Sequence, residues 1–234
     1  MINRIYIPII LMPFLIVLQS CDDEWIFDIP GCMDESALNY DSNATSDNGS
    51  CYYYTLDIDI IDARDYYNWV YFSFSSGQEV TISNPEDSDA WDIAFKRNNI
   101  KTNGGDSGNG EVCAIVDDTK TWTNDSFYSS EQISDGACQT DELIAGDTST
   151  SVGCYSPEGY DPANPNDDHQ FIDCIKNPAL DQWGAFDGLN FIVENYQFFV
   201  RRLDGNYVKL WLMSYEDAND KAGYIFMTYQ IINR

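Results

Sequence analysis

Two neighbouring stretches decide the fold of this chain: Trp91-Asp92-Ile93-Ala94-Phe95-Lys96-Arg97 and Asn103-Gly104-Gly105-Asp106-Ser107-Gly108-Asn109-Gly110. In the first stretch, large apolar residues alternate with polar or small ones, which is the period-two pattern of a half-buried strand. The second is dense in Gly and Asn, which tolerate positive φ and let the backbone approach a neighbour closely. The pair therefore predicts a strand followed by a tightly packed glycine loop.

The β pattern recurs on both sides of these stretches. Leu56, Ile58 and Ile60 alternate with acidic residues, and Trp69–Phe74 is almost continuously aromatic or β-branched, which predicts burial on both faces. Near the C-terminus, apolar runs at 191–202 and 207–213 flank Asp204-Gly205, and a last strand is expected at 224–232. Asp-Gly between apolar runs predicts a hairpin with a type I′ turn. We expect an all-β fold, a single antiparallel β domain with long loops and nearly no helix.

The middle of the chain is different. Residues 117–173 are polar, acidic and interrupted by three prolines, and such a stretch between two β blocks is where binding loops usually lie. After it, Asn177-Pro178 before residues 179–183 predicts a short helical turn that begins with an N-cap and a Pro.

The N-terminus has the pattern of an export signal. Residues 1–20 carry Arg4 and then an apolar run that is too short to span a membrane. The run ends in Leu18-Gln19-Ser20-Cys21, which resembles a bacterial lipobox in which Cys21 is acylated. The acidic residues 22–24 resemble a surface-export signal, and a solvated linker is the alternative. We therefore expect a lipoprotein signal peptide at 1–20, a lipidated tether with a Cys-pair module at 21–51, and a β domain at 52–234.

Cysteine parity supports the lipid anchor. The chain has seven Cys, and acylation of Cys21 leaves an even set that an oxidising compartment favours as disulfides: Cys32, Cys51, Cys113, Cys138, Cys154 and Cys174. Residues 31–51 resemble a short Cys-pair module of Bacteroidetes surface proteins, which implies a Cys32–Cys51 bridge. The remaining pairings stay open, because six Cys allow 15 connectivities.

Composition narrows the function. With 12 Lys and Arg against 39 Asp and Glu, the formal net charge is −27, so nucleic acid and anionic lipid surfaces are poor partners. The sequence also gives little support for an enzyme. Gly105-Asp106-Ser107-Gly108 is similar to the serine loop of trypsin-like proteases, but the chain's one His, His169, follows that serine instead of preceding it. We expect a binding protein rather than an enzyme.

From about Ile58 to the C-terminus, the order and spacing of four segments resemble the HmuY family, haem-binding outer-membrane lipoproteins of Bacteroidetes. The segments are residues 69–74, 91–97, 103–110 and 199–210. The resemblance implies an all-β scaffold that holds haem between loops, with the iron bound axially, in some members by two His. It implies a lipid-anchored outer-membrane protein that faces the cell surface and captures haem for iron acquisition, with an outer-membrane haem transporter or a host haem protein as partner.

Here the iron ligands depart from the two-His pattern. His169 occupies a place in the central loop that resembles a haem-ligand position, and Met213, Met227, Tyr155 and Tyr160 are weaker candidates because iron also accepts thioether and phenolate. Each has an alternative: His169 as a solvated loop residue beside Asp167 and Asp168, and the two Met as core residues on strands.

The haem propionates require cations, and the candidates are Arg201, Arg202 and Lys176, with ordinary surface cations as the alternative. Two alternative functions remain. One is that of a HmuY-like surface lipoprotein that binds another ligand or a protein partner instead of haem, and the other is that of a structural or adhesive module. A haem titration separates these hypotheses.

Overall fold

The computed structural model describes residues 28–35, 37, 40–49, 51, 57–157, 170–187 and 190–233. The chain divides into two compact units, residues 1–53 and 54–234. Within the described residues, no helix has the length and apolar character needed to cross a membrane.

The first unit is a small loop closed by a disulfide. Cys32 and Cys51 are joined, as the resemblance to a Cys-pair module implies. Strands β1 (Pro30–Gly31) and β2 (Ser46–Asp47) pair in parallel across this loop. So short an element has almost no apolar core of its own, and the disulfide contributes about 3 kcal/mol in the chain-entropy description.

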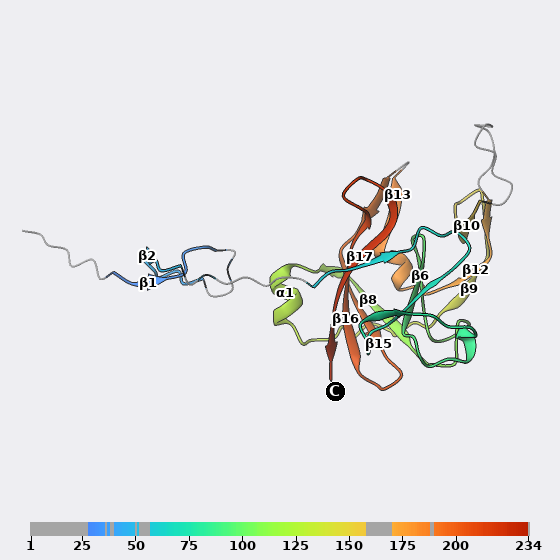
Figure 1. Ribbon diagram of the computed structural model, residues 1–234, viewed down its shortest axis with the longest axis horizontal. Helices are drawn as coiled ribbons and strands as arrows, with labels where there is room; N and C mark the ends of the chain where they lie inside the picture. The colour runs from blue at the N-terminus through green and yellow to red at the C-terminus, as the bar shows by residue number, and fades with distance from the viewer. Residues whose placement is uncertain are drawn as a thin grey trace, which may run out of the picture. The chain divides into compact units, whose positions relative to one another are not determined.

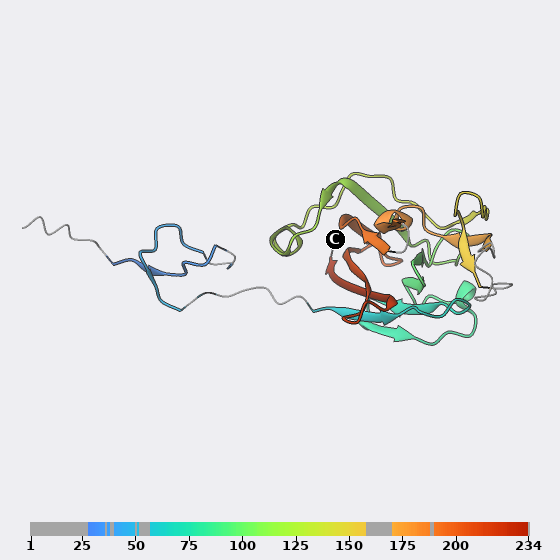
Figure 2. The same cartoon turned by 90° about the horizontal axis from the view of Figure 1, so that it is seen from above.

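The second unit is built around two antiparallel sheets (Figure 1). The strand order is β3-β17-β16-β15-β8 in the five-stranded sheet and β5-β4-β6-β7 in the four-stranded sheet. In chain order these strands are β3 (Asp59–Asp62), β4 (Val70–Ser73), β5 (Gln78–Val80), β6 (Ile93–Lys96), β7 (Asn99–Thr102), β8 (Cys113–Thr121), β15 (Tyr196–Arg201), β16 (Tyr207–Glu216) and β17 (Ala222–Ile232). In Figure 2 the teal strands of residues 59–80 and the green strand β8 lie on opposite sides of the red strands.

Three two-stranded pairs and three short helices complete the unit. The pairs are β9 (Glu142–Ile144) with β12 (Cys174–Lys176), β10 (Cys154–Ser156) with β11 (Gln170–Ile172), and β13 (Gly184–Asp187) with β14 (Asn190–Val193). The helices are η1 (Pro85–Asp87), α1 (Asn124–Ser129) and η2 (Leu180–Trp183). The expected all-β antiparallel fold is confirmed.

The core lies between the two sheets. Phe72, Ile93 and Phe95 of the four-stranded sheet and Phe198 and Leu210 of the five-stranded sheet belong to one buried cluster. A second cluster lies around α1, and it includes Ile115, Trp122, Phe127, Ile133, Phe199 and Trp211. Because strand β15 contributes Phe198 to one cluster and Phe199 to the other, it is buried on both faces, like a central strand.

The stretch at residues 91–97 is more deeply buried than its alternation predicts. Ala94 is fully buried, and Asp92 is only 7 % exposed. The Asp92 carboxylate accepts a hydrogen bond from the backbone N–H of Phe74 at 2.8 Å and one from Nε of Arg202 at 3.2 Å. A buried carboxylate is tolerated because it is paired. The expectation of one solvent-facing side was therefore wrong, because these partners satisfy the polar residue inside.

Two other local predictions need correction. In β3 the buried residue is Ile61, whereas Ile58 and Ile60 are 45 % and 54 % exposed, so the apolar alternation at the start of the domain marks the solvent side. The apolar run at 191–202 is two strands, β14 and β15, because Asn195 adopts a positive φ of 55° between them.

The hairpin at Asp204-Gly205 is confirmed, but its turn is different. Strands β15 and β16 pair up to Arg201 and Tyr207, and the N–H of Gly205 donates to the carbonyl of Arg202 at 3.0 Å. Gly205 has φ 83°, and Asp204 does not have a positive φ. This is the longer loop in which one glycine closes the turn, so positive φ is needed at one position rather than two.

Candidate functional site

The glycine loop is a joint between segments of backbone. A Cβ on Gly104 would lie 2.1 Å from the carbonyl oxygen of Val112, and a Cβ on Gly105 would lie 2.1 Å from that of Asp141. Asn103 is buried and its Nδ2 donates to the carbonyl oxygens of Ser88 at 2.7 Å and of Trp91 at 3.0 Å. The close backbone approach predicted for these glycines is therefore observed, and it serves packing.

A buried carboxylate extends this joint. Asp141 is 2 % exposed and accepts hydrogen bonds from N–H of Thr102 at 2.8 Å, from Oγ1 of Thr102 at 2.7 Å and from Nδ2 of Asn177 at 3.0 Å. Burial raises the pKa of Asp141, while the hydrogen bonds from Thr102 and Asn177 oppose that rise. The network connects β7, the segment before β9 and the segment that leads into η2. We call Asn103, Gly104, Gly105, Asp141 and Asn177 the glycine joint.

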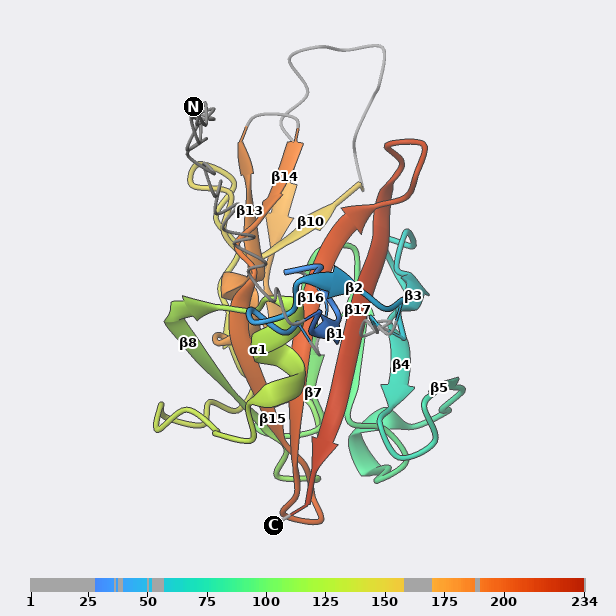
Figure 3. The ribbon, with the colours of Figure 1, turned by 90° about the vertical axis from the view of Figure 1, so that its left-hand side faces the viewer.

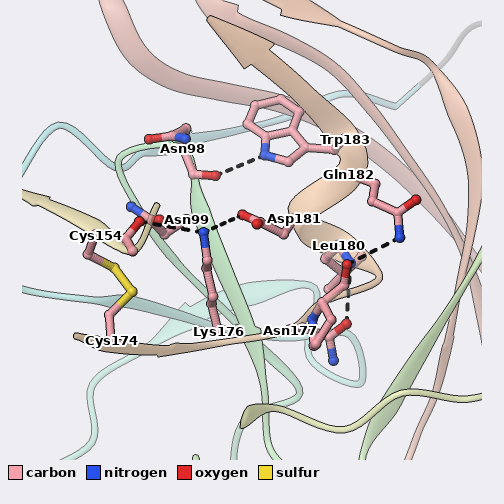
Figure 4. Close-up of polar contacts among 12 residues, drawn as sticks. Asn98, Asn99, Cys154, Cys174, Lys176, Asn177, Leu180, Asp181, Gln182 and Trp183 are labelled. Atoms are coloured by element: carbon pink, nitrogen blue, oxygen red, sulfur yellow. Dashed lines mark hydrogen bonds and ion pairs between the residues drawn. A yellow bond between two sulfur atoms is a disulfide. The ribbon is translucent and has the colours of Figure 1, made fainter. Parts of the chain in front are cut away.

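Asn177 also starts the predicted helical turn. Its Oδ1 accepts hydrogen bonds from the N–H groups of Ala179 at 3.1 Å and Leu180 at 3.2 Å, which is the capping role expected of Asn before a Pro. The turn is a 3₁₀ helix, η2, and Nε1 of its Trp183 donates to the carbonyl of Asn98 at 2.9 Å (Figure 4). These bonds fix η2 against the turn between β6 and β7.

Two hairpins rise from the same end of the β domain (Figure 3). In β10–β11, Tyr155 and Phe171 are register partners with ring centroids 6.0 Å apart. In β13–β14, Phe186 and Phe191 are register partners with centroids 5.1 Å apart. Directly opposed residues of an antiparallel pair lie on the same face, so each hairpin presents one aromatic pair on one face.

Three side chains from other segments connect the two pairs. The ring centroid of Tyr66 lies 5.4 Å from that of Tyr155, and the Tyr215 centroid lies 6.1 Å from Phe186 and 4.8 Å from Phe191. The guanidinium carbon of Arg97 lies 4.5 Å from the Tyr66 ring and 5.6 Å from the Tyr215 ring. The result is a continuous line of contacts, the aromatic band: Tyr66, Arg97, Tyr155, Phe171, Phe186, Phe191 and Tyr215.

Exposure to solvent differs between the residues of the band. Tyr215 is 2 % and Phe191 8 % exposed, whereas Phe186 is 53 % exposed. Burial raises the pKa of Tyr215 to about 12, so its phenol stays neutral at physiological pH. Ile172 and Ile192 of the same hairpins are also exposed, at 47 % and 50 %, but each directly follows a band residue in its strand and so lies on the opposite face of its hairpin. Partly exposed rings on a highly charged protein are typical of a binding surface.

The predicted iron ligands are distributed unequally. Tyr155 lies in the band, and His169 and Tyr160 lie outside the described residues, as does Cys21, the predicted acylation site. Met227 is fully buried in the main core, and Met213 packs against the second cluster around α1. Met227 shares that core with Tyr215 and Phe191 of the band, whereas Met213 packs in the other cluster.

None of the predicted propionate contacts belongs to the band. Arg201 pairs with Tyr207 at the start of β16, and Tyr215 lies eight residues further along that strand, a distance of about 25 Å. Arg202 forms ion pairs with Asp92 at 3.2 Å and Asp204 at 3.0 Å. Lys176 is buried and forms an ion pair with Asp181 at 2.8 Å (Figure 4).

The remaining Cys residues form two disulfides inside the β domain. Cys113 is joined to Cys138, and Cys154 of β10 is joined to Cys174 of β12. The second bridge ties the base of the β10–β11 hairpin to the pair β9–β12. Among the residues that the structure describes, no group of three or more His, Cys, Asp or Glu side chains is placed to hold a metal ion.

A second surface feature lies on the four-stranded sheet. A hollow of about 470 Å³ is lined by Tyr67, Trp69, Tyr71, Glu79 and Pro85, among others. Tyr71 pairs with Ala94, which pairs with Lys101, and Nζ of Lys101 lies 4.8 to 5.3 Å from the ring centroids of Trp69, Tyr71 and Trp91. None of the residues that line this hollow belongs to the aromatic band.

Most of the band was not predicted. Tyr66, Arg97, Phe171 and Phe186 gave no local signal that distinguishes them from the many other aromatic and basic residues of strands. The polar stretch at 117–173, which was predicted to hold binding loops, contains strands β9, β10 and β11 in the structure.

Known proteins share the fold of this chain. The HmuY family model (HmuY protein) matches residues 65–229. An apo HmuY analogue from Tannerella forsythia is similar in structure, with a TM-score of 0.57 and 19 % identity, over 77 % of this chain and 97 % of that chain. No curated protein matches the sequence.

Two other solved structures share the fold. A proposed HmuY-like haem-binding protein from Bacteroides vulgatus has a TM-score of 0.52 and 22 % identity, over 74 % of this chain and 89 % of that one. A proposed lipoprotein from Bacteroides fragilis has a TM-score of 0.55 and 20 % identity, over 74 % and 88 %. With a family match across most of the β domain and these folds in agreement, the chain belongs to the HmuY family.

Proposed function

We propose that this protein is a lipid-anchored surface protein of the outer membrane that binds haem for iron acquisition, and that the porphyrin lies against the aromatic band. The observation that carries the proposal is the pair of hairpins, each with an aromatic register pair, connected through Tyr66 and Tyr215. Family membership and the related solved structures support a haem-binding type of surface lipoprotein.

The described residues fit a flat apolar ring. Aromatic side chains stack favourably on other ring systems, and Phe186 exposes apolar surface at the end of the band. Burial of about 200 Å² of apolar surface contributes about 5 kcal/mol. The long-range repulsion between an acidic protein and an anionic porphyrin is screened beyond about 8 Å at physiological salt. Short-range apolar contact therefore outweighs the net charge.

The axial ligand that we propose is His169. It immediately precedes β11, so it stands two residues before Phe171 of the band. When bound, haem iron supplies coordination positions for one or two axial side chains. Tyr155 is the candidate for a second axial position among the residues that the structure describes, because it already lies in the band. Tyr160 is a weaker candidate for that position. The buried Met227 and the packed Met213 would have to leave their clusters to reach it.

The anchor and partners follow from the same proposal. Acylation at Cys21 would hold the chain at the membrane through lipid alone, with the β domain facing outward. An outer-membrane haem transporter or a host haem protein is the partner that such a role requires. We propose binding and delivery rather than catalysis.

A second candidate function is a HmuY-like module that binds another flat ligand or a protein partner. The observation in its favour is the single His, since the aromatic band can hold an apolar ring without any metal ligand.

A haem titration tests the proposal. The chain without its first 21 residues is titrated with haem under oxidising and reducing conditions, and the Soret band is followed. We expect a saturable shift that changes in position in His169→Ala and stays unchanged in Tyr160→Phe, which removes the phenol of the weaker candidate. Saturable binding whose spectrum is the same in His169→Ala overturns His169 as the ligand. The absence of a shifted band under both conditions overturns haem binding.

A further inference from the structure

Arg97 is held rigidly at the centre of the aromatic band. It lies in the turn between β6 and β7 with φ 54°, and its backbone N–H donates to the carbonyl of Ala63 at 2.7 Å. Its guanidinium is flanked by Tyr66 and Tyr215, with centroid distances of 4.5 and 5.6 Å. A planar guanidinium between two rings has little freedom to move.

Only one nitrogen of this guanidinium is engaged by the backbone. NH1 donates to the carbonyl oxygens of Arg64 at 3.3 Å and Ala222 at 3.4 Å. Gly223 makes room for it, since a Cβ there would lie 2.4 Å from that nitrogen. Across the described part of the chain, no hydrogen bond uses Nε or NH2 of Arg97, so donors of the guanidinium fork remain available.

Arg97 also lacks a counter-charge. The ion pairs found among the described residues use Arg64, Lys120, Lys176 and Arg202, but not Arg97. Its neighbour Arg64 is neutralised by Asp62 at 2.6 Å. In a chain with 39 acidic and 12 basic residues, an unpaired guanidinium among aromatic rings is a site arranged for an anion from outside.

We infer that Arg97 binds a carboxylate of the ligand, so that the aromatic band selects flat apolar molecules with an acidic edge. The inference rests on the proposed function, for which the carboxylate is a porphyrin propionate. Arg is suited to this role because it stays charged at all relevant pH values and binds carboxylates through two parallel hydrogen bonds.

The test uses porphyrins without iron, so that it does not depend on an axial ligand. Protoporphyrin IX and its dimethyl ester are titrated into the chain without its first 21 residues, and porphyrin fluorescence reports binding. We expect the free acid to bind more tightly than the ester. Arg97→Gln should weaken binding of the acid by about tenfold to a hundredfold, the effect of one charge-assisted hydrogen bond, and leave the ester unchanged.

Two variants serve as controls. Arg201→Gln removes a cation at the end of β15, opposite the far end of β16, and should leave both affinities unchanged. Arg97→Lys keeps the charge without the planar fork and should give an intermediate affinity for the acid only. Near-UV circular dichroism of each variant establishes that the aromatic packing is retained.

The outcomes separate this inference from the proposed function. Equal binding of acid and ester by the wild type, or an equal loss of both in Arg97→Gln, overturns the role of Arg97. Acid-selective binding that depends on Arg97, together with failure of the haem titration, retains the anion site and removes haem as its ligand. If neither porphyrin binds, the role of Arg97 is overturned, and haem binding is decided by the haem titration alone.

Discussion

The glycine joint and the aromatic band lie in one β domain but are held together by different interactions. The joint is made of backbone approaches and buried hydrogen bonds, such as those that Asp141 accepts from Thr102 and Asn177. The band is made of ring contacts that lead from buried Tyr215 to exposed Phe186. The stretch that most resembles the HmuY family thus maintains the fold. The residues that would touch a ligand lie elsewhere, so membership of the family leaves the ligand to be tested.

The largest effect should come from adding one methyl group to the joint. Gly105→Ala places a Cβ against the carbonyl of Asp141 at a residue with φ 61°, so overpacking and backbone strain add. We expect the free energy of unfolding to fall by about 3 kcal/mol or more, measured by urea denaturation and Trp fluorescence. Gly205→Ala is the matched control, since Gly205 also has a positive φ but no atom within 4 Å of the added Cβ. If Gly105→Ala lowers the free energy of unfolding as little as the control does, the close backbone approach at Gly105 does not stabilise the fold.

A smaller effect on stability should come from the titration of Asp141. Burial raises the pKa of this carboxyl, so the folded state holds the proton more tightly than the unfolded chain, whose Asp titrates near pH 3.9. The free energy of unfolding of the wild type should therefore fall relative to Asp141→Asn as pH rises from about 4 through the raised pKa. Urea unfolding of both proteins from pH 4.5 to 7 measures this difference. A difference that grows with pH would show that the hydrogen bonds outweigh burial.

The smallest effect on stability should come from the exposed end of the band. Phe186 is 53 % exposed, so Phe186→Ala should lower the free energy of unfolding by less than about 1 kcal/mol. Porphyrin affinity should fall several-fold, because one ring of an aromatic pair is lost. Leu203→Ala removes a side chain of similar exposure, 51 %, at the other end of β16, and should leave affinity unchanged. Equal porphyrin affinities of Phe186→Ala and Leu203→Ala would show that the aromatic band does not bind the ligand.

Local pattern predicted the parts of the fold that depend on local chemistry. The hairpin at Asp204-Gly205, the cap at Asn177 and the close approach of Gly104 and Gly105 all follow from what these residue types permit. The turn type was wrong, because one positive φ at Gly205 satisfies a longer loop. Ile60 was misread because its alternation with acidic residues does not say which face is covered.

The candidate site was largely unpredictable for a different reason. Tyr66, Arg97, Tyr155, Phe186 and Tyr215 come from five separate segments, and only tertiary packing brings them together. Arg201 and Arg202 looked equally suitable as cations, but Arg201 lies at the end of β15 far from Tyr215, and Arg202 is paired with carboxylates. No spacing within the sequence encodes that difference.

A crystal structure of the protein grown with haem tests the central claim most directly. We predict that the porphyrin contacts both aromatic pairs, Tyr155 with Phe171 and Phe186 with Phe191, and that a carboxylate lies within hydrogen-bond distance of Arg97. Haem bound instead in the hollow beside Trp69 and Tyr71, with the aromatic band in contact with solvent alone, would contradict it.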